Sequence, residues 1–139
     1  MIARLIVRAR WRDERGSSIV EFAMISVLLV FLLFAVLQVA AYFYVKSIVS
    51  AAASDGARYG ANAGLDPALG GERANLLVGQ ALSTQMSRRL PCTGDQTVDA
   101  ASGLVAARVK CHGQISSIFF PVGAFITIDV TGRSLKEGS

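Results

Sequence analysis

A long apolar run dominates the first third of the chain. From Phe22 to Val45 there are 24 residues without a formal charge. A helix rises about 1.5 Å per residue and needs roughly 20 apolar residues to cross the hydrocarbon core of a bilayer. The run is therefore predicted to be a transmembrane helix, because backbone polar groups in lipid must be paired within their own segment. Tyr42, Tyr44 and Lys46 near its C-terminal end are typical of a membrane interface.

The helix is expected to continue beyond the bilayer. The stretch after Lys46 is rich in small residues and contains no proline, whereas Gly60, Gly64 and Pro67 supply stop signals. One helix from about Ser18 to Gly60 is therefore predicted. Its first part crosses the membrane and its second part belongs to the exported region.

The remainder of the chain first follows a helical period and then a period of two. Apolar residues recur at helical spacing over residues 72–90, which predicts an amphipathic helix with Asp66 and Pro67 near its start. Apolar and polar residues then alternate, which predicts half-buried strands. These strands are expected at residues 105–112 and 126–131, with a weaker one at 96–100.

These elements predict an α+β protein. A long N-terminal transmembrane helix continues outside the membrane and is followed by a small domain of one amphipathic helix and an antiparallel β-sheet. The expected parts are a basic leader at residues 1–16, the helix at 17–62 and the exported domain at 63–139.

Composition and charge narrow the class of protein. The chain has 139 residues, 53% of them hydrophobic, and a single long apolar run, which argues against both a purely soluble protein and a polytopic transporter. Residues 1–16 hold five arginines against Asp13 and Glu14, a charge of 5 − 2 = +3. Such a flank favours a cytoplasmic N-terminus and an extracytoplasmic C-terminal domain in a single-pass protein of the cell membrane. No nucleic-acid partner is expected, because basic and aromatic residues do not interleave further along.

Two cysteines, Cys92 and Cys111, both lie in the part expected outside the cytoplasm. They enclose 18 residues, since 111 − 92 − 1 = 18. A pair in an oxidising compartment favours a disulfide, which for such a loop contributes about 3 kcal/mol. Free thiols are a less favoured alternative. A metal site that includes His112 is disfavoured, because neighbouring residues of a strand point to opposite faces.

The junction between the basic end and the apolar run carries a lone carboxylate, Glu21. One interpretation is that it simply solvates itself at the membrane interface. A functional interpretation of Glu21 applies if the chain is cut between Gly16 and Ser17. Ser17 is then the N-terminal residue, and Glu21 lies on the same helical face, four residues further along. Glu21 would sit in the first turn of the mature helix, where a negative charge is favourable. Among packed helices it would then meet the ammonium group of a neighbour's residue 17, which fixes register.

This arrangement resembles a type IV prepilin signal. The shared features are a short basic leader, Gly16, a glutamate at the fifth mature position and an uninterrupted apolar helix. A later stretch, with the sequence Gly56-Ala57-Arg58-Tyr59, resembles the TadE-like minor pseudopilins of tight-adherence (Flp) pilus systems. The resemblance covers residues 15–61 well and the rest loosely. Many members have a proline where this chain has Val27, so the kink of those helices is not expected here.

The resemblance implies a pathway and a set of partners. A prepilin peptidase would cut after Gly16, and Glu21 and Phe22 would set the register of assembly. The mature protein would wait in membrane lipid before it takes part in pilus biogenesis. The filament would serve adhesion, secretion or both. The implied partners are the peptidase, the major pilin, other minor pseudopilins and the inner-membrane platform, with no cofactor and no small-molecule substrate.

Three other interpretations compete with this one. A secretory signal peptide cut near Ala51–Ala53 is disfavoured, because the apolar run exceeds the usual length of about 7–15 residues. An uncut membrane-anchored extracytoplasmic assembly or ligand-binding factor would use the same helix and strands. An enzyme is not expected, because His112 and the Ser116-Ser117 pair lack a partner base, and no phosphate loop or metal spacing is present.

Two further features leave alternatives open. The rings of Phe119 and Phe120 are expected either to tuck under the sheet or to form an exposed contact for another subunit. Gln38 is the polar exception near the end of the apolar run. It either forms a hydrogen bond between helices or is simply tolerated.

Overall fold

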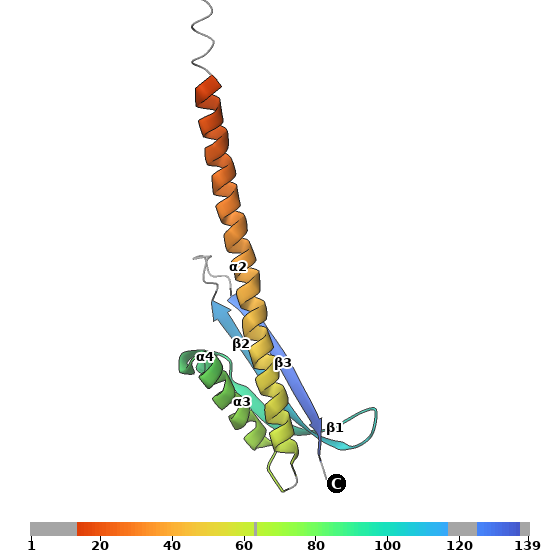
Figure 1. The fold of residues 1–139 in the computed structure, drawn as a ribbon. Coiled ribbons are helices and arrows are strands. Elements are labelled where there is room, and N and C mark those ends of the chain that lie inside the picture. The colour runs from red at the N-terminus through yellow and green to blue at the C-terminus, as the bar shows by residue number, and fades with distance from the viewer. Residues whose placement is uncertain (1–13, 63, 117–124, 137–139) are drawn as a thin grey trace, which may run out of the picture. The chain divides into compact units, whose positions relative to one another are not determined.

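The computed structural model describes residues 14–62, 64–116 and 125–136. Its elements follow the order expected for an α+β protein, so the predicted fold class is confirmed (Figure 1). They are α2 (Glu14–Ala61), α3 (Ala68–Ala81), α4 (Thr84–Arg89), β1 (Cys92–Val98), β2 (Val105–Ser116) and β3 (Phe125–Leu135).

The chain divides into two compact units, Met1–Val39 and Ala40–Ser139. Helix α2 belongs to both, and its 48 residues confirm the single long helix predicted across residues 18–60. The helix ends at Ala61, and Gly64 follows with a φ of 81°. Glycine adopts this left-handed conformation without steric cost, which explains why the chain turns here.

The single helix expected over residues 72–90 is instead two helices, α3 and α4. The Oδ1 atom of Asp66 accepts a hydrogen bond from the Ala68 amide at 2.9 Å, so α3 starts where the sequence signals indicated. Ser83 has an extended backbone, and its hydroxyl accepts from the Met86 amide at 3.1 Å. This N-cap starts a second helix, because the serine satisfies an amide that a continuous helix would pair internally.

The sheet has three antiparallel strands in the order β1-β2-β3. Strands β2 and β3 contain the two predicted strands and extend them to 12 and 11 residues. The weak strand expected at 96–100 is β1, which instead begins at Cys92 and ends at Val98. The next residues form a turn, in which Asp99 accepts hydrogen bonds from the amide and hydroxyl of Ser102 and Gly103 has a φ of 69°.

The core of the second unit forms where α2, α3 and α4 meet one face of the sheet (Figure 1). It is built mostly from small and medium side chains, which lets backbones approach closely. Its buried members are Val49, Ala52, Ala53, Ala57, Ala74, Val78, Leu90, Cys92, Val109, Cys111, Ile128 and Val130.

Glycines mark the places where these elements touch. A Cβ atom added at Gly56 of α2 would overlap the carbonyl oxygen of Gly70 in α3, and one added at Gly70 would overlap that of Gly56. A Cβ at Gly132 of β3 would overlap the Ala53 carbonyl group of α2. The close contacts of α2 with α3 and with β3 therefore depend on missing side chains, which hydrophobic periodicity does not reveal.

Candidate functional site in the N-terminal helix

The predicted cleavage site lies at the start of α2. Gly16 and Ser17 are within the helical backbone, whereas the leader residues before Glu14 lie outside the described residues. Glu21 and Phe22 are exposed side chains one turn further along. Because the segment is helical, positions 17 and 21 fall on one face, as the proposed register contact requires. The Ser26 hydroxyl donates back to the Phe22 carbonyl at 2.7 Å, so this polar side chain is paired inside the helix.

The next part of α2 exposes its apolar side chains. Among the described residues, Ser18–Ala61 is a helix long and apolar enough to cross a membrane, consistent with a single-pass membrane protein. From Ile19 to Val39, large hydrophobic side chains are exposed on every side of the helix. Residues 19–39 span about 31 Å at the rise of an α-helix, which matches the hydrocarbon thickness of a bilayer.

Gln38 is the polar side chain near the end of this exposed stretch. Its Oε1 atom is buried and has no hydrogen-bond partner in the described part of the chain. An unpaired amide oxygen in an apolar environment is costly. The hydrogen bond between helices considered from the sequence stays a prediction.

The Gly56-Ala57-Arg58-Tyr59 stretch divides between the core and the surface. Gly56 and Ala57 are buried, and Gly56 makes the close contact with Gly70 described above. The side chains of Arg58 and Tyr59 are exposed. The first two residues therefore hold α2 against α3, and the other two remain available to a partner.

An ion pair crosses the seam between α2 and α3. The Arg73 Nε atom lies 3.3 Å from Asp55 Oδ2, and both side chains are about half exposed. Exposed pairs of this kind contribute about 0–1 kcal/mol, so the seam is held mainly by its buried alanines and glycines. Apolar residues line shallow grooves on both sides of Arg73, and they include Ala51, Leu77, Tyr59 and Leu76.

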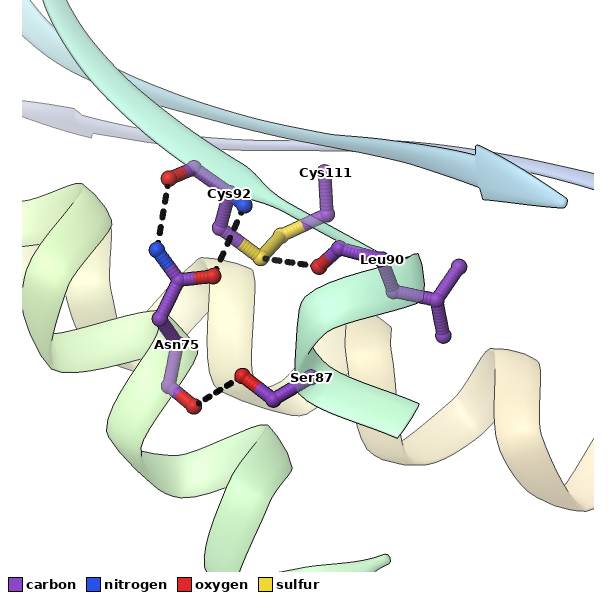
Figure 2. The surroundings of a disulfide bond; sticks show 5 residues. All are labelled: Asn75, Ser87, Leu90, Cys92 and Cys111. Atoms are coloured by element: carbon purple, nitrogen blue, oxygen red, sulfur yellow. Dashed lines mark hydrogen bonds between the residues drawn. A yellow bond between two sulfur atoms is a disulfide. The ribbon is translucent and has the colours of Figure 1, made fainter. Parts of the chain in front are cut away.

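Cys92 and Cys111 form a disulfide, which confirms the predicted bridge. The two residues face each other in the register of β1 and β2, with Cα atoms 4.0 Å apart, and both are buried. Figure 2 shows the Asn75 side chain of α3 alongside the bridge. Its Oδ1 accepts from the Cys92 amide at 2.8 Å and its Nδ2 donates to the Cys92 carbonyl at 2.9 Å. Asn75 thus pairs with β1 as a neighbouring strand would, and it pins α3 to the bridged strands.

A second polar side chain extends this network. The Ser87 hydroxyl of α4 donates to the Asn75 carbonyl at 2.9 Å (Figure 2). The Leu90 carbonyl oxygen lies 3.7 Å from Cys92 Sγ, and the Leu90 side chain is fully buried. The disulfide, α3 and α4 therefore form one connected cluster. The sequence indicated the bridge, but it gave no sign of the role of Asn75, because a polar residue on an amphipathic helix is normally solvated.

The outer face of the sheet is polar and carries an Arg–Asp ion pair and a His–Asp contact. Arg108 Nε donates to Asp95 Oδ1 at 2.8 Å, and a second guanidinium N–H contacts Oδ2. This hydrogen bond lowers the pKa of Asp95 and raises that of Arg108. His112 lies opposite Asp129, with Nδ1 3.7 Å from Oδ2. His112 is thus exposed on this face, whereas Cys111 beside it is buried on the other.

Some expectations fall on residues that are not described. Phe119 and Phe120 lie outside the described residues, as does Ser117, so the two alternatives for the rings stay open. Ser116, the neighbour of Ser117, ends β2 and accepts a hydrogen bond from Arg89 Nη1 at 3.3 Å.

Comparison with known proteins adds one finding. The model of the TadE-like protein family matches residues 16–58. The match begins at the glycine of the expected cleavage site and ends at Arg58 in the Gly56-Ala57-Arg58-Tyr59 stretch. No curated protein and no solved structure matches the chain. The resemblance found in the sequence is thereby confirmed for residues 16–58, which match the TadE-like family.

Proposed function

We propose that this protein is a minor pseudopilin that takes part in assembling a tight-adherence (Flp) pilus. The TadE-like match already indicates a role in pilus assembly. The observation that carries the finer proposal is the helical segment from Ser17 to Glu21, which starts immediately after the first matched residue, Gly16. The protein serves as a structural subunit and not as an enzyme, and it needs no cofactor.

In this proposal the chain is cut after Gly16 by a membrane-embedded prepilin peptidase. The mature protein starts at Ser17, with its N-terminus on the cytoplasmic side and the second unit outside. Its exposed apolar helix holds it in membrane lipid until it joins the pilus. The partners are the major pilin, other minor pseudopilins and the inner-membrane platform, and they contact the exposed faces of α2.

Processing is tested by the intact mass and N-terminal sequence of the membrane-extracted protein. Cleavage after Gly16 removes 16 residues, so we expect a mass lower by about 2 kDa and a new terminus at Ser17, whereas a signal-peptidase product would lose nearer 6 kDa. Gly16→Leu should stay uncut, because a bulky side chain obstructs the peptidase. A wild-type chain that keeps Met1 in a host with an active prepilin peptidase would instead indicate a permanently anchored assembly or ligand-binding factor.

The role of Glu21 is tested separately from processing. Glu21→Ala should leave membrane insertion and cleavage intact but reduce the number of pili, because the carboxylate that meets the ammonium group of a neighbour is lost. Glu21→Asp, which keeps the charge, should retain more pili than Glu21→Gln, which keeps the size. Equal piliation in all three variants would contradict the register role.

A further inference from the structure

One end of the second unit is marked by the entry of α2 at Ala40. The first turn and a half of the helix inside this unit exposes two aromatic side chains, Phe43 and Tyr44. Lys46 follows, with its Nζ atom 5.8 Å from the ring centroid of Tyr42. Aromatic rings and long cationic side chains of this kind are typical of the headgroup level of a bilayer.

Strand β3 reaches the same end of the unit. Gly132 of β3 lies against Ala53 of α2, and the two elements run in the same general direction (Figure 1). Going back along the strand from Gly132 to Phe125 covers about 23 Å at the rise of a β-strand. Going back along the helix from Ala53 to Ala40 covers about 20 Å. Phe125 therefore lies near the level at which α2 enters the unit.

A guanidinium group contacts the residue that pairs with Phe125. Arg89 ends α4, and its Nη1 donates to the hydroxyl of Ser116, the residue that faces Phe125 in the register of β2 and β3. The Phe125 side chain is 66% exposed, and Arg89 is exposed as well. An aromatic ring and a cation thus come from β3 and α4 to the level where α2 supplies Tyr44 and Lys46.

We propose that the end of the second unit formed by Phe43, Tyr44, Lys46, Arg89 and Phe125, here named the membrane-facing end, binds the headgroup region of the bilayer. The occupant is the bilayer because the apolar helix that crosses it leaves the unit at this end. The rings enter the interface, and Arg89 and Lys46 pair with lipid phosphates. The proposal depends on α2 as a membrane span and not on the pilus assignment.

The test places a tryptophan at this end of the full-length chain. Trp11, the single tryptophan of the sequence, is first replaced by Phe, and Phe125→Trp is then introduced. The protein is reconstituted in vesicles of phosphatidylcholine and phosphatidylglycerol with brominated acyl chains. The matched control is Val98→Trp, because Val98 is 64% exposed and ends β1 opposite Val105, at the other end of the sheet. We expect brominated lipid to quench the Phe125→Trp emission and aqueous iodide to quench that of Val98→Trp.

A second pair of variants tests the cation. Arg89→Gln should lose part of the lipid quenching of the Phe125→Trp protein, because a lipid phosphate loses its guanidinium partner. Ser116→Ala removes only the hydrogen bond to Arg89 and should retain the quenching. Iodide quenching of Phe125→Trp equal to that of Val98→Trp, without quenching by brominated lipid, would overturn the proposal. If Arg89→Gln leaves the quenching unchanged, Arg89 does not bind lipid and is not part of the membrane-facing end.

Discussion

Gly56 shows how a single residue serves both the family motif and the fold. A Cβ atom at this position would overlap the Gly70 carbonyl oxygen and approach Ala74. We expect Gly56→Ala to lower the free energy of unfolding of the second unit by about 1–3 kcal/mol, because two backbones must move apart. Thermal denaturation of the full-length protein in detergent, followed by circular dichroism, measures this loss.

Gly79 supplies the matched control at the residue scale. It also lies inside a helix, but a Cβ there would meet Ser87 at 3.6 Å, an ordinary contact. Gly79→Ala should therefore leave the unit unchanged or stabilise it by up to about 1 kcal/mol, since alanine is the better helix former. A Gly56→Ala protein that melts like the Gly79→Ala protein would show that the α2–α3 contact does not need glycine.

At the scale of elements, the bridge between β1 and β2 should set the stability of the second unit. Replacing both Cys92 and Cys111 by Ala should cost roughly 3 kcal/mol, because the unfolded chain is no longer constrained. For a unit of this size the cost corresponds to a melting temperature lower by about 10–20 °C. Reductant should shift the wild-type protein toward the variant and leave the variant itself unaffected. Identical wild-type melting with and without reductant would contradict this role.

The elements also show which features the sequence could predict. Apolar runs and strict alternation indicated α2, β2 and β3, because burial repeats at a fixed period. The break at Ser83 was missed because the apolar spacing continues across it, with Leu82 and Met86 both packed on the core. Residues 92–95 of β1 were missed because Gly94 and Asp95 are typical turn residues. Gly94 instead lies where Pro67 and Gly71 approach the strand, and Asp95 pairs with Arg108 on the outer face.

At the scale of the whole molecule, the candidate functional segment and the folded core have different origins of stability. The helix from Ile19 to Val39 relies on its own backbone hydrogen bonds and on an apolar surrounding, since its large apolar side chains are exposed. The second unit relies on side-chain packing and one disulfide. An apolar helix such as Ile19–Val39 can be predicted from composition alone. The second unit depends on close contacts between residues distant in the sequence, such as Asn75 with Cys92, and no local pattern predicts these contacts.

This difference predicts two separable responses to heat. In detergent micelles, heating with reductant should abolish the near-ultraviolet signal of the packed second unit and the β-sheet signal. The helical signal of residues 19–39 should persist, because a micelle leaves no competing water for those backbone groups. Far- and near-ultraviolet circular dichroism recorded on one sample would separate the two. Complete loss of helix in a single transition would contradict the prediction and show that the apolar segment depends on the fold that follows it.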